Sequence, residues 1–410
     1  MSVSPSGRAA AAHAALALGG LAIGTTEFAT MAILPLFSRG LGVAIPIGAR
    51  AISAYALGVV VGAPLLAAAS ARAGRRGMLL LLLAWIAAGN LLSAFAPSFG
   101  ALLACRFLSG LPHGAYFGLA ALVASDLVRE RRRAVAVGRV MAGLTLATVV
   151  GAPLANLLAQ AAGWRACFVA VTAMAVASAA AVRALVPAGP DPALSGLFGQ
   201  FADLRRVQVW LTLATGAVGF GGMFAIYTFL VPTLAAVTRA SPVSASLVLA
   251  LFGVGMTAGN LVVPPLAGRA PMRAAGALLL LGVAASAVYP LAAHALWSMS
   301  AVVVALGLGG ALGTLLQTRL MDVAGDAQAV AAALNHSAFN IANALGPWLA
   351  GTAIAAGGGW TSAGWVAAGL SVGGLVICSA SLALDRHVRR ALAPSPRRGG
   401  RPHDQLFQGE

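Results

Sequence analysis

The sequence contains little charge and very little acid. Charged residues make up 9% of the 410 positions, whereas hydrophobic residues make up 60%. So little charge cannot cover the surface of a water-soluble chain of this length, which excludes a soluble globular protein. Lysine is absent, so all 26 basic residues are arginine. Cys105, Cys167 and Cys378 are scattered over apolar segments, so we expect them to pack there without forming disulfides or a metal site.

Long apolar runs recur along the whole chain. Each can cross about 30 Å of hydrocarbon, and must then be helical because backbone groups in lipid have to bond within their own segment. The sequence predicts an all-α integral membrane protein with twelve spans, at residues 14–36, 49–70, 78–96, 99–123, 135–160, 165–187, 208–235, 243–266, 274–292, 296–318, 328–352 and 362–384. The first run is too long for a secretory signal and contains Glu27 and Pro35, so we expect it to be retained.

The arginines lie mainly on one side of the predicted membrane. Most arginines of the connections, and the tail from Arg386 to Arg401, share the side of the N-terminus; Arg39, Arg50, Arg165 and Arg239 lie opposite. Positive residues favour the inner side, so both termini are predicted to be cytoplasmic in a multi-pass protein of the cell inner (plasma) membrane. The net charge of +16 then reflects topology and contact with anionic lipid, and we expect no nucleic-acid partner.

The chain divides into two halves of six spans. We predict an N-terminal six-helix bundle at 1–187, a cytoplasmic linker at 188–207, a C-terminal bundle at 208–384 and an Arg-rich cytoplasmic tail at 385–410. The halves resemble each other weakly: Pro153 and Trp164 are echoed by Pro347 and Trp360, which lie 194 and 196 residues further on. Two related bundles are common in secondary transporters, whose substrate site lies between them near the midplane.

Glu27 is the one acidic residue inside an apolar run. A carboxylate at membrane depth is costly and by default marks a pathway for an ion, proton or substrate. Arg106 lies at a similar depth, so we expect it to pair with Glu27, directly or through water, and the pair to loosen on protonation. A static ion pair is the alternative. His113 follows on the face of Arg106 and either relays protons or is a neutral histidine bonded to a backbone carbonyl.

Further polar and aromatic side chains are candidates for a substrate cavity. A polar stripe in the eleventh run either lines a cavity or bonds neighbouring helices. An aromatic face of the seventh run, which includes Met223, suits an uncharged or amphipathic solute, or simple packing. The candidates are the stripe His336, Asn340 and Asn343, the face Phe220, Phe224 and Tyr227, and Thr30, Met31 and Phe117.

The fifth run carries small residues at intervals of four, from Gly143 through Gly151 to Ala155. Such a face lets a neighbouring helix approach closely, and Pro153 bends the helix by removing a hydrogen bond. The sequence has no Walker loop, dinucleotide fingerprint or metal-ligand cluster. We therefore expect no enzyme activity, metal or cofactor, and an ion gradient, here protons, as the source of energy.

Four stretches carry a resemblance to a known family: Gly24–Phe28, Arg106–Gly114, Gly143–Arg165 and Asn335–Asn340. Together they resemble the major facilitator superfamily over nearly the whole chain. More narrowly they are similar to its twelve-span drug:proton antiporters, in the arabinose-efflux-permease-like and chloramphenicol-efflux-like branch. The resemblance implies an acidic motif around Glu27, an arginine motif implicated in proton coupling at Arg106, and an antiporter motif in the fifth run.

The loop after the second run departs from the superfamily's pattern. Ala71 stands about where an aspartate usually precedes Gly-Arg-Arg, so the conformational latch of that aspartate is in doubt. Asp126 and the cluster Arg129–Arg133 are candidates for a substitute contact. The residues to which the resemblance gives conformational roles are Arg72, Gly74, Arg75, Arg76, Gly110, Gly143, Gly151, Pro153 and Pro347.

Together with the resemblance, which alone favours export over import, the sequence leads us to expect a proton-coupled exporter of small organic solutes, such as a chloramphenicol-like drug, a sugar or another metabolite. We expect a monomer whose bundles rock about a central site. One alternative is a proton-coupled nutrient importer on the same fold. A second is a non-transporting membrane receptor, which predicts no solute flux.

Overall fold

The computed structural model describes residues 5–70, 74–188, 206–268, 270–324 and 328–392. These residues are almost entirely helical, and eleven of their helices are long and apolar enough to cross a membrane. The expected all-α membrane fold is confirmed. The expected eleventh span is also a long helix, but it is not among these eleven, and it carries several asparagines and a histidine.

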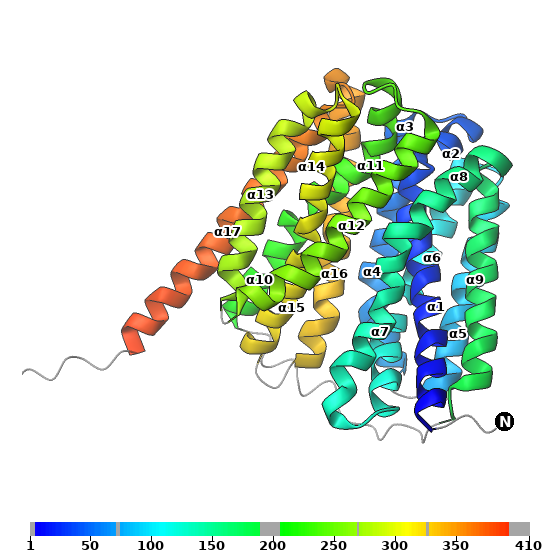
Figure 1. The fold of residues 1–410 in the computed structure, drawn as a ribbon, viewed down its shortest axis with the longest axis vertical. Coiled ribbons are helices and arrows are strands. Elements are labelled where there is room, and N and C mark those ends of the chain that lie inside the picture. The colour runs from blue at the N-terminus through cyan, green and yellow to red at the C-terminus, as the bar shows by residue number, and fades with distance from the viewer. Residues whose placement is uncertain (1–4, 71–73, 189–205, 269, 325–327, 393–410) are drawn as a thin grey trace, which may run out of the picture.

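The first half of the chain forms α1 to α9 (Figure 1). Their bounds are α1 Pro5–Ala32, α2 Leu34–Gly40, α3 Ile45–Gly48, α4 Arg50–Ser70, α5 Arg75–Ala94, α6 Phe99–Asp126, α7 Arg133–Leu146, α8 Ala152–Ala162 and α9 Trp164–Leu185. The expected fifth span is α7 and α8 joined by a π-helical turn, Ala147–Gly151, which ends two residues before Pro153. Proline removes a backbone donor, which accounts for the irregular turn there.

The second half forms α10 to α17. Their bounds are α10 Val207–Gly219, α11 Gly221–Ala236, α12 Pro242–Ala267, α13 Pro271–Ala292, α14 Leu296–Leu308, α15 Leu312–Val323, α16 Gln328–Ala353 and α17 Ser362–Leu392. The expected seventh span is interrupted at Phe220, between two glycines, and a short 3₁₀ turn separates α14 from α15. Most of the expected linker and the end of the tail, 189–205 and 393–410, lie outside the described residues.

Glycines allow two pairs of helices to cross at very short range. A Cβ on Gly58, Gly62 or Gly110 would clash with backbone atoms across the contact between α4 and α6. A Cβ on Gly255, Gly259 or Gly307 would clash in the same way between α12 and α14, and each of these glycines lies 197 residues after its counterpart. The same close crossing therefore occurs in each half, in agreement with the weak repeat in the sequence.

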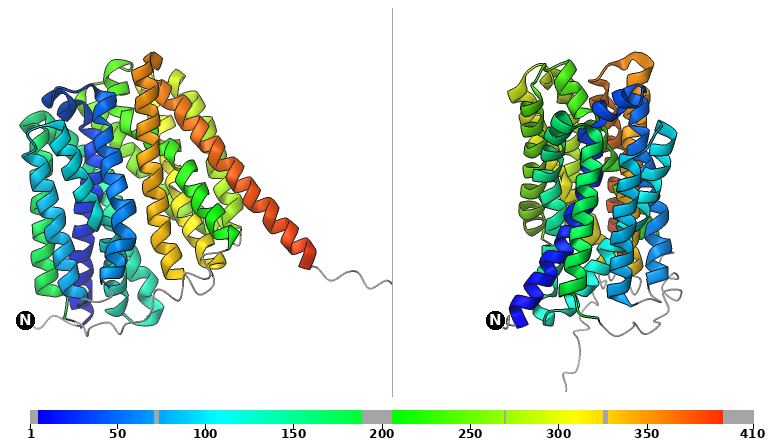
Figure 2. Two further views of the ribbon diagram at one scale, coloured as in Figure 1. Left: turned by 180° about the vertical axis from the view of Figure 1, so that it is seen from behind. Right: turned by 90° about the vertical axis from the view of Figure 1, so that its right-hand side faces the viewer.

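The two halves meet near one end of the molecule, where α2 and α3 lie (Figure 1). Asn156 of α8 donates from Nδ2 to Ser246 Oγ of α12 at 2.9 Å. The backbone of Thr148 packs against Gly253 so closely that a Cβ there would clash. At the opposite end, α1 begins and α17 ends, and α17 leans away from the first half (Figure 2).

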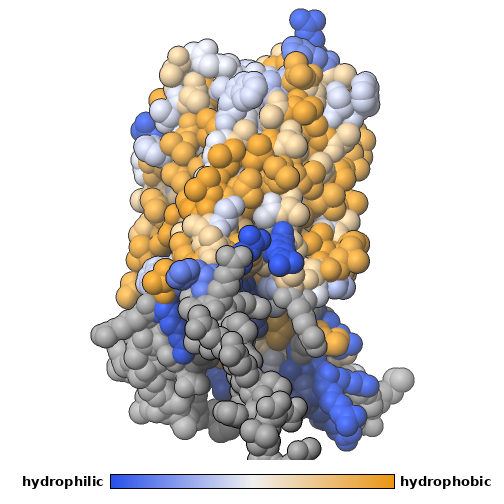
Figure 3. All heavy atoms as spheres, turned by 90° about the vertical axis from the view of Figure 1, so that its left-hand side faces the viewer, coloured by the Kyte–Doolittle hydropathy of each residue, from blue (hydrophilic) through white to orange (hydrophobic). Residues whose placement is uncertain are grey.

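The outer surface has the character expected of a protein in lipid. A broad apolar band covers the face drawn in Figure 3, and hydrophilic residues gather below it. Large apolar side chains such as Leu65, Leu261 and Leu266 are more than half exposed. A soluble protein would not leave so many in water.

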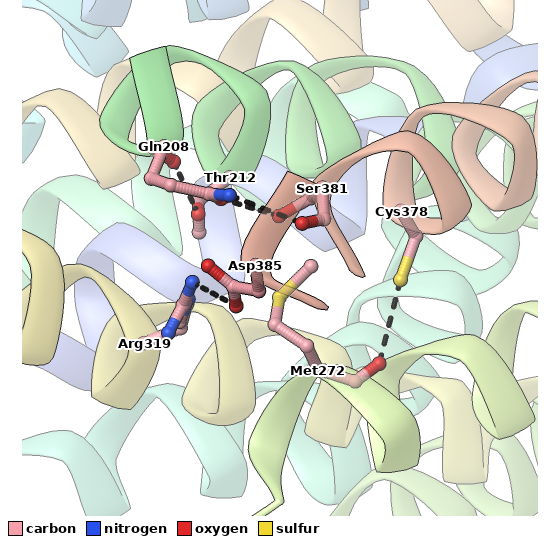
Figure 4. A network of polar contacts seen from close by, with 7 residues as sticks. All are labelled: Gln208, Thr212, Met272, Arg319, Cys378, Ser381 and Asp385. Carbon is pink, nitrogen blue, oxygen red and sulfur yellow. Dashed lines mark hydrogen bonds and ion pairs between the residues drawn. The ribbon is translucent and has the colours of Figure 1, made fainter. Parts of the chain in front are cut away.

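A polar network holds α17 to its neighbours at the lower end of the second half (Figure 4). Arg319 of α15 donates to Asp385 of α17 at 2.5 Å. Ser381 donates to Gln208 Oε1 of α10 at 2.6 Å, and Gln208 Nε2 donates back to the Ser381 carbonyl at 3.0 Å. A hollow of about 380 Å³, lined by Arg206, Asp322 and Asp385 among others, lies beside this network.

Candidate functional site

Glu27 lies near the C-terminal end of α1 and is buried between the two halves. Its side chain is 7% exposed. Its Oε1 accepts a hydrogen bond of 2.7 Å from Nδ2 of Asn343, which belongs to α16 in the second half. The sequence placed both residues in the candidate site, and the structure brings them into contact across 316 residues of chain.

Arg106 of α6 is fully buried and donates hydrogen bonds to Thr26, the residue before Glu27. Its Nη1 donates to Thr26 Oγ1 at 2.8 Å, and its Nη2 donates to the Thr26 carbonyl at 3.1 Å. Thr26 Oγ1 in turn donates to Asn90 Oδ1 of α5 at 2.5 Å. No ion pair within 4 Å joins Arg106 to Glu27 in the described part of the chain. Of the two forms of pair that the sequence allowed, direct or through water, the direct one is therefore absent: successive residues of a helix point about 100° apart, and Arg106 meets Thr26.

Tyr55 of α4 completes the surroundings of Arg106. The guanidinium carbon lies 4.3 Å from the centre of the Tyr55 ring and 5.5 Å from that of Phe168, which suits cation–π contacts. The Tyr55 hydroxyl lies 2.9 Å from Nδ1 of His113. The close α4–α6 crossing at Gly110 sets this arrangement, because Gly110 packs directly against the Tyr55 carbonyl.

The expected face of α6 forms a chain of rings that crosses to the second half. His113 and Phe117 have ring centres 5.3 Å apart. Phe117 and His336 of α16 are stacked, with centres 6.4 Å apart and planes 3° from parallel. His113 thus meets Tyr55 through a ring nitrogen and does not bond a backbone carbonyl through Nδ1.

The aromatic face of α10 and α11 lies next to Glu27. Phe28, which follows Glu27, has its ring 5.6 Å from that of Tyr227 and 6.5 Å from that of Phe224. Phe220 lies 5.4 Å from Phe224. Phe220 and Met223 also line a small cavity of about 30 Å³ inside the second half.

The polar stripe of α16 retains free hydrogen-bond acceptors. Asn340 Nδ2 donates to the His336 carbonyl of its own helix at 3.0 Å. The side-chain oxygens of Asn340 and Asn343 are buried and have no hydrogen-bond partner among the described residues. Ser53 of α4 donates to the Ala344 carbonyl at 2.9 Å, which ties α16 to the first half at the residue after Asn343.

The remaining cavity candidates are held within α1. Thr30 donates to the Thr26 carbonyl at 2.6 Å, so its hydroxyl is used inside its own helix. Met31 is fully buried in the apolar core. Both residues lie about one helical turn after Glu27. Neither offers the solute a polar atom that lacks a hydrogen-bond partner.

The small face of the fifth span packs against α1, as its spacing predicts. A Cβ on Gly143 would clash with the Ala17 carbonyl, and one on Gly151 would clash with Thr25. Pro153 is buried directly after this contact, and Pro347 lies inside α16. The face therefore holds the helix that carries Glu27.

The loop before α5 is described in part. Gly74 is the N-cap of α5, and Arg75 forms an ion pair with Asp126 at the end of α6. Arg76 follows in the first turn of α5. Arg72 and Ala71 lie outside the described residues. The candidate substitute contact at Asp126 thus exists, and its partner is Arg75.

Sequence reasoning passed over Tyr55 and Asn90, and gave Thr26 no role. All three are polar residues inside expected spans, and the structure shows that they are buried. A polar side chain within an apolar run is the sequence signal that could have identified them. Within the described residues, no group of three or more His, Cys, Asp and Glu is placed to hold a metal ion.

A multi-span membrane fold with two similar helical halves and a buried acid between them defines a class, the secondary transporters. Residues 16–347, and again 240–405, match the sequence profile of the Major Facilitator Superfamily. The chain belongs to the major facilitator superfamily, whose members are transporters and not enzymes.

Its relatives are bacterial transporters. The chain is 40% identical to the inner membrane transport protein YdhP of Escherichia coli K12, over 85% of this chain and 90% of that one. It is 32% identical to the putative transporter AraJ of the same organism, over 83% and 87%. It is 34% identical to a chloramphenicol resistance protein of Streptomyces lividans, over 83% and 88%. The chain is thus a multi-pass protein of the inner membrane.

A solved structure confirms the fold. The crystal structure of a bacterial homologue of the human lysosomal transporter Spinster, in an inward-facing and occupied conformation, superposes with a TM-score of 0.70. The two sequences are 18% identical, and the match covers 93% of this chain and 98% of the other. At this identity the likeness concerns the fold alone.

Proposed function

We propose that this chain is a proton-coupled antiporter that exports small organic solutes from the cytoplasm. The observation that carries the proposal is the position of Glu27. It is a buried carboxylate that touches both halves of the fold, through its own helix and through Asn343. A group that takes up and releases a proton at such a place can bias how the two halves pack.

The coupling requires two conformations that differ at Glu27. With the site open outward, a proton from the more acidic side neutralises Glu27, and the protonated carrier returns inward. Solute binding then favours release of the proton toward the cytoplasm, and the loaded carrier reopens outward. Protonation has to change the relative stability of the two conformations by only a few kcal/mol.

The described conformation suits the stage in which the outer end is closed. The start of α1, the end of α17 and the described Arg129–Arg133 cluster occupy the end that we assign to the cytoplasm. The halves are held together by Asn156 and Ser246 near the other end. The carrier is proposed to work as a monomer, with protons as the coupling ion, and with its arginines against anionic lipid.

The solute is proposed to be an uncharged or amphipathic molecule with an aromatic or apolar body. The aromatic face around Phe224 and Tyr227 suits such a body. The unpartnered side-chain oxygen of Asn340 suits its hydroxyl or N–H groups. Chloramphenicol-like drugs and sugars both carry such donors, and relatives named for chloramphenicol resistance and as a probable sugar efflux transporter point the same way.

Everted membrane vesicles test the proposal. Respiration acidifies their lumen, and an exported solute is pumped into that lumen in exchange for protons. Adding a transported solute should therefore raise the lumenal pH. A panel of antibiotics and sugars without any response, together with solute-induced alkalinisation of the medium by intact cells, would indicate import.

A further inference from the structure

The bond between Asn343 and Glu27 is a hydrogen bond between the two halves of the fold. Asn343 Nδ2 is the donor and Glu27 Oε1 the acceptor, at 2.7 Å. The Asn343 side chain is fully buried, so its amide is not exchanging this bond with bulk water. α16 is fixed here by Ser53, which bonds the carbonyl of Ala344.

The other polar groups near Glu27 belong to its own half. Arg106 of α6 and Tyr55 of α4 both lie close enough to act on the carboxylate through space, and Tyr55 contacts the Arg106 guanidinium. Thr26 of α1 lies between Glu27 and Arg106. These groups accompany Glu27 when the halves rock as rigid bodies.

From the second half, α16 presents Asn343 to the carboxylate, and α11 presents aromatic rings to the neighbouring Phe28. The titratable group of α16 is His336, which is stacked on Phe117; Phe117 in turn contacts His113. Asn343 is therefore the described polar partner of Glu27 that moves away when the halves separate.

We propose that Asn343 makes the protonation of Glu27 depend on conformation, and so couples proton transfer to the movement of the two halves. When the halves meet at Glu27, the amide N–H stabilises the ionised carboxylate, and the proton leaves to cytoplasmic water. When the halves part, the carboxylate loses this donor and takes a proton from the outer water. The inference rests on the proposed function.

An amide is suited to this role for two reasons. It has no charge of its own, so its N–H stabilises an ionised carboxylate without competing for the proton. A hydrogen bond to a charged group is about twice as strong as a neutral one. Making and breaking one such bond changes a protonation equilibrium about tenfold or more. Asn343 is a positioning residue that acts through Glu27.

The test compares Asn343→Leu with the matched control Asn340→Leu in proteoliposomes. Asn340 lies one turn earlier on the same helix, but its Nδ2 donates to the His336 carbonyl of its own helix. The substrate is the compound that gives the largest response with the wild-type protein. Two readouts are taken: accumulation driven by a pH gradient, and exchange of labelled for unlabelled solute without a gradient, each over a range of pH.

Asn343→Leu is expected to retain exchange within about threefold. Its gradient-driven accumulation should fall about tenfold, and its pH profile should move by about one unit toward higher pH, because the donor to the ionised form is gone. Asn340→Leu should leave the pH profile of transport unchanged. A wild-type profile and full accumulation in Asn343→Leu would overturn the inference.

A reciprocal exchange covers the case in which Asn343→Leu does not fold. Glu27→Gln with Asn343→Asp moves the carboxylate to α16 and the amide to α1, and keeps one acid and one amide across the halves. The double variant should recover at least fivefold more gradient-driven accumulation than Glu27→Gln alone. No recovery in a double variant that thermal denaturation shows to be folded would contradict the inference. Absence of proton-driven transport in the wild type would instead refute the proposed function.

Discussion

Arg106 of α6 binds Thr26 of α1 through both the hydroxyl and the carbonyl oxygen, at 2.8 and 3.1 Å. The arginine therefore holds the helix of Glu27 without neutralising its carboxylate in a direct ion pair. A direct pair buried in lipid would be hard to separate during a transport cycle. Contact through the neighbouring residue keeps the positive charge near the carboxylate and leaves the carboxylate available to Asn343.

Thr26→Val tests the link between Arg106 and α1. Valine has the shape of threonine but no hydroxyl, so one N–H of a buried guanidinium and one oxygen of Asn90 lose their partner. Such a loss costs about 1–3 kcal/mol. We expect gradient-driven transport to fall about tenfold or more.

Thr30→Val is the matched control for Thr26→Val. The Thr30 hydroxyl bonds only the Thr26 carbonyl among the described residues, within its own helix. Its loss should change transport by less than threefold. Equal effects of the two variants would show that the Arg106–Thr26 contact has no special role.

Gly110→Ala tests the close crossing of α4 and α6. A Cβ at this position clashes with the Tyr55 carbonyl, which belongs to the backbone and cannot rotate away. Overpacking of this kind costs about 1–3 kcal/mol. The midpoint of thermal unfolding in detergent should fall, and the Tyr55–His113 contact should be displaced with it.

Gly118→Ala serves as the control on the same helix, two turns further on. A Cβ there meets nothing within 4 Å, so its midpoint should equal the wild-type value or rise slightly, because alanine favours helix. If Gly110→Ala were as stable as Gly118→Ala, the crossing could not be as close as described.

Asn156→Cys with Ser246→Cys tests whether the outer ends of the halves separate during transport. The two side chains now touch at 2.9 Å, one on α8 and the other on α12. In a background with the native cysteines changed to alanine, an oxidant should cross-link the pair. Transport should then stop, and a reductant should restore it.

The pair Ser241→Cys and Ser244→Cys provides a control cross-link within the second half. Their hydroxyls lie 3.0 Å apart at the start of α12. This cross-link should leave transport intact, because it does not join the halves. Full transport after the cross-link between α8 and α12 has formed would show that the two halves do not separate at this interface.

The sequence was sufficient to predict the membrane fold and the faces of single helices. Apolar length located eleven of the twelve expected spans, and helical spacing placed His113 and Phe117 on the face of Arg106, where the structure has them. The small face of the fifth span also packs closely on a neighbour, as predicted.

The spacing of residues along one helix does not show which other helix packs against a given face. The contact between Glu27 and Asn343 joins residues 316 apart, and nothing in the local sequence of either points to the other. Tyr55 was missed because one tyrosine in an apolar run is most often packing. A Glu27–Arg106 pair, direct or through water, was expected from matching depth, but depth does not fix the direction in which a side chain points from its helix.

The most direct test of the account is the lumenal pH of everted vesicles that carry wild-type protein or Glu27→Gln. Glutamine keeps the size of the side chain and the ability to bond Asn343, but it cannot take up a proton. We predict that a transported solute raises lumenal pH with the wild type and has no effect with Glu27→Gln, although the variant still binds solute. An undiminished proton release by Glu27→Gln would contradict the central role of this carboxylate.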